Sequence, residues 1–230
     1  MIRVRASEAR GRGNHGWLDS RHSFSFADYY DPKHMGFSAL RVINEDQVAP
    51  GAGFGSHGHR DMEIISYVLD GVIAHQDSEG NVQQLPAGEF QLMSAGRGIR
   101  HSEFNASESR GLRFLQIWIE PDQLGGKPGY QQKDFGRANG LTLVLSPDGE
   151  AGSLRLRQDA KLYQLLLDAD QPLTHATAPG RRQYVHLIRG ELRIGNTPLK
   201  PGDGAMIEHL AQLAFQAGAQ PVQALLFDLP

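Results

Sequence analysis

Short apolar runs recur along this chain, and polar turns separate them. Each run has about the length of a strand, and many alternate or carry β-branched and aromatic residues. Turn signals such as Asp70-Gly71 and Arg189-Gly190 mark where runs end. Regular short strands with turns between them predict an all-β sandwich or barrel. The clearest runs are 38–43, 63–69, 72–75, 89–93, 112–119, 141–145, 162–167, 184–188, 191–194 and 223–227.

Helical periodicity is nearly absent, so we expect little helix. Residues 158–166 are the one ambiguous segment.

A change of composition divides the chain. Residues 121–134, PDQLGGKPGYQQKD, are rich in Gly, Pro and polar residues and form the best linker candidate. On both sides the sequence repeats strand, turn, strand and a Pro- and Gly-containing turn, at 72–89 and again at 184–203. Two copies of one β-barrel unit would produce this repeat. We therefore expect one domain over 1–132 and a second over 133–230.

The composition narrows the range of functions. Hydrophobic residues make up 40% of the 230, which permits a sizeable core, and the net charge of −3 comes without the clustered positive charge that nucleic acids require. There are no cysteines, so disulfides, zinc fingers, iron–sulfur clusters and thiolate copper sites are excluded. The N-terminus lacks the apolar core of a signal peptide, and no stretch approaches the roughly 18 apolar residues of a membrane span. We expect a soluble, cytoplasmic protein that binds neither nucleic acid nor membrane.

Two pairs of polar residues have the spacing of metal ligands on strands. His57 and His59 are two apart, as are His101 and Glu103, and side chains two apart on a strand share one face. Two neighbouring strands would bring together three imidazoles and a carboxylate, a set suited to Fe, Ni, Cu, Mn or Zn. Glu63 has the same parity as the first pair if its strand stays regular. The remaining histidines lack such a spacing and are expected to be surface or hydrogen-bonded core residues: His15, His22, His34, His75, His175, His186 and His209.

The residues around these pairs resemble a known family. The spacing Gly51-x5-His57-x-His59-x3-Glu63-x7-Gly71 is similar to the first cupin motif. The spacing Gly80-x5-Pro86-x-Gly88, followed by His101-x3-Asn105, is similar to the second, although Gly88 and His101 lie farther apart than in ordinary cupins. That departure, the HSE sequence at 101–103 and the N-terminal stretch HGWLDSRHSFSFADYYDP resemble pirin and its bacterial relatives.

The resemblance implies a bicupin, in which two packed cupin (jelly-roll type) β-barrels with little helix carry one metal in the N-terminal barrel. Carried over position by position, the family's ligands fall on His57, His59, His101 and Glu103. In many cupins the carboxylate of the first motif is the fourth ligand, so Glu63 is the alternative, with a hydrogen bond to a liganding imidazole as its other role. The second barrel has no His-x-His, and we expect no metal site there.

Bacterial members of the family resemble quercetinases, which implies a dioxygenase that opens the heterocyclic ring of a flavonol with O₂ and releases CO. Fe(II) is the expected ion, with Zn, Cu, Ni, Mn or Co as alternatives. A bound metal lowers the pKa of a hydroxyl, and Glu103 is the candidate base for the proton of the flavonol 3-hydroxyl. An apolar barrel would accept a flat aromatic substrate, and Phe37, Phe54 and Phe104 are candidates for its wall, although core packing is the stronger expectation for each.

Two other classes of function stay open at this point. Eukaryotic pirin is similar to a redox-responsive transcriptional coregulator, so a non-enzymatic regulator that binds a protein partner is one alternative, and a cupin-type metal-dependent isomerase is another. One fold hosts many functions, so the fold does not decide between them. Oxygen uptake with a flavonol, partner binding that depends on the metal, and anaerobic turnover would distinguish the three.

Overall fold

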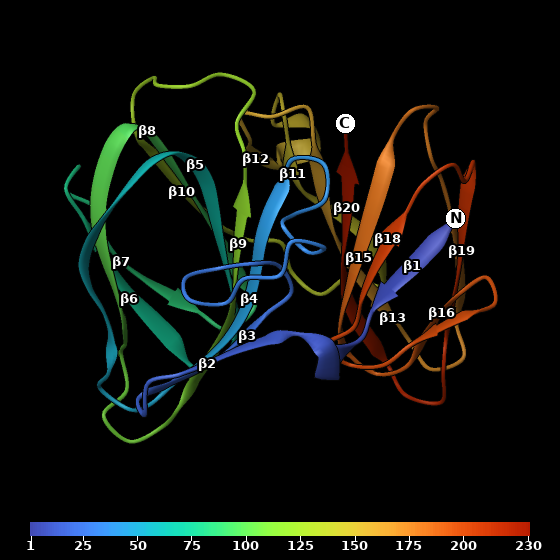
Figure 1. Ribbon diagram of the computed structural model, residues 1–230, viewed down its shortest axis with the longest axis horizontal. Helices are drawn as coiled ribbons and strands as arrows, with labels where there is room; N and C mark the ends of the chain where they lie inside the picture. The colour runs from blue at the N-terminus through green and yellow to red at the C-terminus, as the bar shows by residue number, and fades with distance from the viewer. The chain divides into compact units, whose positions relative to one another are not determined.

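The computed structural model describes residues 1–230, in which every element longer than three residues is a β-strand. The strands form three sheets (Figure 1). There is no α-helix, so the all-β class predicted from the short apolar runs is confirmed. The two short 3-10 helices are η1 (Ser7–Ala9) and η2 (Glu150–Gly152).

The largest sheet has nine strands and is built from the first part of the chain. Its order is β2-β3-β4-β9-β5-β8-β6-β7, and β10 pairs with β8 off this path. The strands are β2 (Gly11–Asn14), β3 (Leu18–His22), β4 (Leu40–Val48), β5 (Gly53–Asp70), β6 (Val72–Asp77), β7 (Val82–Pro86), β8 (Glu89–Asn105), β9 (Leu112–Ile119) and β10 (Gly129–Asp134).

The other two sheets are built mainly from the last part of the chain. A seven-stranded sheet has the order β1-β18-β15-β20-β13-β11-β12, and a four-stranded sheet has the order β14-β19-β16-β17. The strands are β1 (Ile2–Arg5), β11 (Gly140–Ser146), β12 (Leu154–Arg155), β13 (Lys161–Leu167), β14 (Pro172–Ala176), β15 (Arg182–Arg189), β16 (Leu192–Ile194), β17 (Thr197–Leu199), β18 (Gly204–Ile207), β19 (Gln212–Ala217) and β20 (Val222–Leu229).

The burial of each strand follows its sequence pattern. In β19 every second side chain is buried, as its alternation of polar and apolar residues requires. In β15 six consecutive residues are buried, because both faces of this strand are covered. The ambiguous segment 158–166 is not helical: its apolar part forms β13, which pairs with β11 and β20. The neighbouring strands on both sides pair with the backbone N–H and C=O groups of this segment, which in a helix would pair with one another.

The contacts divide the chain into two compact units. The first unit comprises Gly11–Gly136 with Leu156–Gln158, and the second comprises Met1–Arg10, Arg137–Arg155 and Asp159–Pro230. Met1–Arg10 lies in the second unit because β1 pairs with β18. The division into domains at 132 and 133 stays a prediction, but the linker expected over 121–134 is only partly irregular, since β10 pairs with β8 along 129–134.

Each unit has its own apolar core. In the first, Val68, Ile73, Leu85 and Phe114 pack together and are fully or almost fully buried. In the second, a larger cluster that includes Leu165, Val185, Leu213, Phe215 and Leu226 fills the space between the strands. Burial of such side chains is the main favourable contribution to folding.

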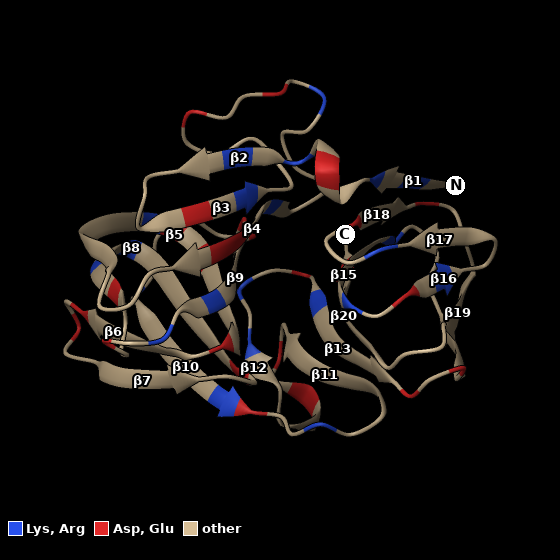
Figure 2. Cartoon of the chain, turned by 90° about the horizontal axis from the view of Figure 1, so that it is seen from below, with Lys and Arg blue, Asp and Glu red and all other residues tan.

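Charged residues are interspersed on the strands. Figure 2 shows acidic and basic segments side by side on β3, where the Arg21 Nε lies 3.4 Å from the Asp19 Oδ1. No helix of the chain is long and apolar enough to cross a membrane.

Candidate metal centre

The two longest strands, β5 and β8, carry the predicted ligands. They pair antiparallel, with His57 opposite His101 and Phe54 opposite Glu103. Side chains two apart on a strand share a face, so His57 and His59 lie on one face of β5, and His101 and Glu103 lie on one face of β8. The pairing register therefore brings both predicted pairs to the same part of the barrel.

Three imidazoles converge on one point. The Nε2 of His101 lies 3.0 Å from the Nε2 of His59 and 3.1 Å from the Nε2 of His57. His101 is buried, whereas His57 and His59 are half-buried. The three side chains therefore form a group that could hold a divalent metal, with His101 at its centre.

Two of these imidazoles have lowered pKa values, and a hydrogen bond orients the third. The Nδ1 of His57 lies 2.8 Å from the Gly55 carbonyl, which can only accept, so Nδ1 donates there and Nε2 faces the group. Burial lowers the pKa of His59 to about 4 and that of His101 to about 3, and the neighbouring imidazoles shift both in the same direction. A metal needs such unprotonated nitrogens, so this donor set fits one.

Glu103 lies next to His101 and is almost completely buried. Its Oε1 accepts a hydrogen bond from Ser66 at 3.0 Å, and its Oε2 accepts one from Gln116 at 2.9 Å. Glu103 falls in a second metal-capable group, with His75 and His101, whose ligand atoms lie within 4.8 Å of one another. His101 is thus common to both groups. The place of Glu103 as fourth ligand to the triad stays a prediction.

Glu63, the alternative ligand, belongs to neither group. The β5–β8 register shifts between His59 and Asp61, and Asp61 adopts a left-handed φ of 66°. After this bulge Ser66 faces Glu103, so Glu63, three residues earlier, faces the other side. There its Oε2 accepts hydrogen bonds from Ser94 at 2.9 Å and from the Arg157 backbone at 3.2 Å. The expectation that Glu63 shares a face with the histidines is wrong, because it assumed a regular strand.

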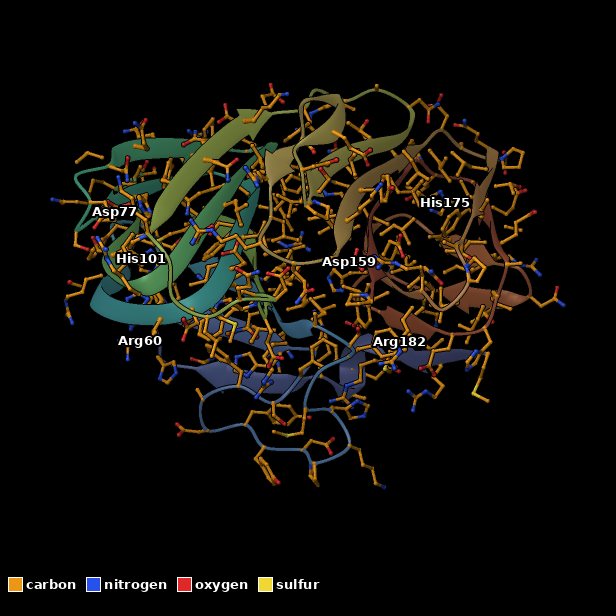
Figure 3. All side chains as sticks on the ribbon, turned by 90° about the horizontal axis from the view of Figure 1, so that it is seen from above. Arg60, Asp77, His101, Asp159, His175 and Arg182 are labelled. Atoms are coloured by element: carbon orange, nitrogen blue, oxygen red, sulfur yellow. The ribbon has the colours of Figure 1, made fainter.

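His75 is a residue that the sequence interpretation missed. It was expected to have no metal-site partner, yet it lies directly opposite Glu103 and is 1% exposed. Its Nε2 lies 3.2 Å from the Asp77 carboxylate, and Asp77 lies opposite His101 (Figure 3). A His-x-Asp pair on β6 was the available signal, since it matches the spacing of the two pairs that were recognised.

A cavity of about 580 Å³ lies beside His57 and His59. Its apolar wall contains Trp17, Leu18, Phe26, Phe54 and Trp118. The rings of Phe26 and Trp118 meet edge to face at 5.3 Å, and those of Trp17 and Phe54 at 5.1 Å. The volume and the aromatic wall are those of a site for a small flat molecule.

Of the three phenylalanines considered for this wall, only Phe54 lines it. Phe37 is buried, as core packing predicts, whereas Phe104 is 39% exposed.

Both metal-capable groups lie in the first unit. In the second unit, the strands enclose a cluster of apolar side chains. His186 is fully buried on β15, and His175 is half-buried on β14. Neither is part of a group that could hold a metal.

Comparisons with known proteins identify the family. The sequence profile described as Pirin matches residues 3–119. The chain belongs to the pirin family. A profile described as the quercetinase C-terminal cupin domain matches residues 143–229 of this pirin-family chain.

Relatives match this chain along its whole length. A protein named quercetin 2,3-dioxygenase, from Escherichia coli (strain K12), is 50% identical over 100% of this chain and 99% of its own length. Pirin-like protein YhaK from the same strain is 35% identical over 100% of both chains. The crystal structure of bacterial pirin YhhW from Escherichia coli in complex with nickel(II) has a TM-score of 0.97 and 49% identity over 100% of this chain and 99% of its own. The bicupin fold implied by the sequence resemblance is confirmed.

More distant structures share the fold alone. Quercetin 2,3-dioxygenase from Acinetobacter baumannii is 16% identical with a TM-score of 0.80, covering 99% of this chain and 78% of its own.

We expect the stability of the metal-free protein to fall as the pH is lowered from about 6.5 toward 4. The pKa of His59 is about 4 in the folded state and 6.5 in its reference state, so the unfolded chain binds more protons in this window. The contribution of His59 to stability should therefore rise with pH between about 4 and 6.5 and level off above 6.5. Urea midpoints of the wild type and of His59→Asn, measured from pH 4.5 to 8, check this. The variant should show a flatter dependence, and superimposable profiles would contradict the prediction.

Proposed function

We propose that this pirin-family chain is a quercetin 2,3-dioxygenase, which opens the heterocyclic ring of a flavonol with O₂ and releases CO. One observation carries the proposal: three imidazoles converge beside a cavity of about 580 Å³ with an aromatic wall. That arrangement fits a metal-dependent reaction on a flat aromatic molecule. The full-length similarity to a protein named quercetin 2,3-dioxygenase supports the same reaction.

The cofactor in this proposal is one divalent metal held by His57, His59 and His101, with Glu103 as the fourth ligand. A set of three nitrogens and one oxygen suits Fe(II), which we propose as the native ion. The nickel(II) complex of a related pirin supports binding of a divalent transition metal by this family. When bound, the metal supplies Lewis acidity to the substrate hydroxyl and a path for electron density toward O₂.

Glu103 takes the proton from the flavonol 3-hydroxyl in this reaction. A carboxylate can act as a base when it is ionised and within hydrogen-bond reach. The hydrogen bonds from Ser66 and Gln116 reach both oxygens of Glu103 and fix the orientation of the carboxylate. The aromatic wall excludes water and holds the flat ring system against the imidazoles.

Oxygen consumption with quercetin tests the proposal. Protein treated with a chelator should consume no O₂ above the uncatalysed rate, and Fe(II) should restore consumption together with CO release. The metal would be required because a bound metal lowers the pKa of the substrate hydroxyl, and the deprotonated flavonol is the form that reacts with O₂. An oxygen electrode measures the O₂ consumed, and a CO assay measures the CO released. Equal loss of flavonol with and without bound metal would refute the dioxygenase.

We expect one equivalent of tightly bound metal per chain. Both metal-capable groups share His101, and the interior of the second unit is filled with apolar side chains. Substitution of His57 should abolish tight binding, whereas His186→Asn should leave one equivalent bound. Metal analysis of the purified protein by mass spectrometry measures the ratio. Two tightly bound equivalents would contradict the prediction.

A further inference from the structure

Four polar side chains form a row along the cavity wall on β3 and β4. Ser20 lies directly opposite Asp46, and His22 lies directly opposite Asn44. Each of the four is at most 5% exposed, yet each lines the same cavity as His57 and His59. None belongs to a metal-capable group, and the proposed proton transfer to Glu103 uses none of them. Burial of polar groups is costly unless they are hydrogen-bonded, so the partners of these four side chains decide what the row can bind.

Three of these side chains form a hydrogen-bonded chain. Ser20 donates to Asp46, and the Nε2 of His22 lies 2.8 Å from the Ser20 hydroxyl. A hydroxyl has one hydrogen, so Ser20 accepts from His22 whenever it donates to the carboxylate. Burial raises the pKa of Asp46 to about 7, the hydrogen bond from Ser20 opposes this rise, and the charges of Glu103 and Glu45 add to it. Near neutral pH a protonated Asp46 can therefore also donate to Ser20, which reverses the chain.

Asn44 contributes an acceptor that has no partner within the protein. Its Oδ1 is buried and makes no hydrogen bond, and the residue is 2% exposed. An unpaired buried acceptor is unfavourable, and a group that enters the cavity with a donor would relieve it. A phenolic hydroxyl is such a group, and it can also accept from a neighbouring donor.

We propose that Asn44 and the Asp46–Ser20–His22 chain bind a phenolic hydroxyl of the substrate on a ring remote from the reacting 3-hydroxyl. This subsite rests on the proposed function and deepens it, because it selects flavonols that carry further hydroxyls. The phenol donates its one hydrogen to the Oδ1 of Asn44, and the phenol oxygen accepts a second hydrogen bond from the chain. The aromatic wall formed by Trp17, Phe26 and Trp118 holds the ring that carries the hydroxyl.

Binding of two flavonols to the metal-loaded protein under anaerobic conditions tests the subsite. Quercetin has hydroxyls on both outer rings, whereas 3-hydroxyflavone keeps the 3-hydroxyl and the 4-carbonyl and has no other. The only two tryptophans of the chain, Trp17 and Trp118, line the cavity, so quenching of their fluorescence reports binding. The wild type should prefer quercetin. The preference is the Kd of 3-hydroxyflavone divided by the Kd of quercetin. Asn44→Leu and Ser20→Ala should each reduce this ratio by about 10-fold, the usual contribution of a hydrogen bond to a buried or charged group.

Gln47→Leu is the matched control, because it makes the same kind of change on the exposed side of β4 and should leave the ratio unaltered. A wild type that binds both flavonols equally would overturn the subsite, and so would variants that weaken both equally. The proposed function fails separately: a protein that prefers quercetin as described but consumes no O₂ retains the subsite and loses the dioxygenase activity. A protein that consumes O₂ with equal kcat/KM for both flavonols retains the dioxygenase activity and loses the subsite. Binding of neither flavonol would overturn both proposals.

Discussion

Replacement of His101 by Asn should abolish tight metal binding and, with it, the proposed oxygen consumption, because this residue is the centre of the candidate site. Its Nε2 lies within 3.1 Å of the Nε2 atoms of both His57 and His59, and it belongs to both metal-capable groups. Changes that merely perturb the partners of a ligand cost 10–100-fold in affinity, so loss of the shared ligand should cost roughly 10²-fold or more. Metal titration by calorimetry and the oxygen electrode measure the two effects.

His175→Asn is the control for this substitution, since His175 is half-buried on β14 and stands outside both groups. It should bind metal and consume oxygen as the wild type does. A His101→Asn protein that stays folded by circular dichroism and still holds one equivalent of metal at wild-type affinity would show that the triad is not the binding site.

Replacement of Glu103 by Gln should lower turnover per bound metal by roughly 10²–10⁴-fold, the usual contribution of a general base. Glutamine keeps the size of the side chain and an oxygen that can accept from Ser66 or Gln116, but it cannot take the proton of the 3-hydroxyl. Some loss of metal affinity is also expected, so metal content must be measured on the same sample. Single-turnover kinetics with quercetin, normalised to bound metal, gives the relevant rate.

Glu63→Gln is a matched control. Glu63 is a fully buried carboxylate on the same strand as His57 and His59, but it faces Ser94 and the Arg157 backbone. This variant should turn over normally per bound metal. Normal turnover per metal in Glu103→Gln as well would mean that Glu103 holds metal but does not act as the base.

Much of the fold was accessible from the sequence, because strand formation depends on local pattern. Eight of the ten apolar runs lie wholly on strands, including the run that becomes β13, and the runs 38–43 and 191–194 begin just before β4 and β16. The strands that were missed are mostly short or polar, such as β2 and β3. They form because β3 pairs with β4 and β2 pairs with β3, and not because of their own composition.

The convergence of the three histidines was also accessible, because its signal is local. Each pair is two residues apart on a strand, and this spacing fixes a shared face wherever the strand is regular. The absence of cysteine limited the donors to imidazole and carboxylate. The glycines and prolines at cupin-like spacings around the pairs then indicated the pirin family, and the family profile and the full-length relatives confirm it.

Only the tertiary structure decided which other residues join the site. The left-handed Asp61 shifts the register of β5 and turns Glu63 away, and an alternating pattern cannot reveal such a bulge. His75 reaches Glu103 because β6 pairs with β8 at that register. Ser20 and Asp46 line the same cavity as His57 and His59 because β9 connects β4, and through it β3, to β5 in one sheet. Sequence determines what each strand presents on its two faces, but pairing between strands distant in the chain determines which faces meet, since that register depends on the packing of the whole barrel.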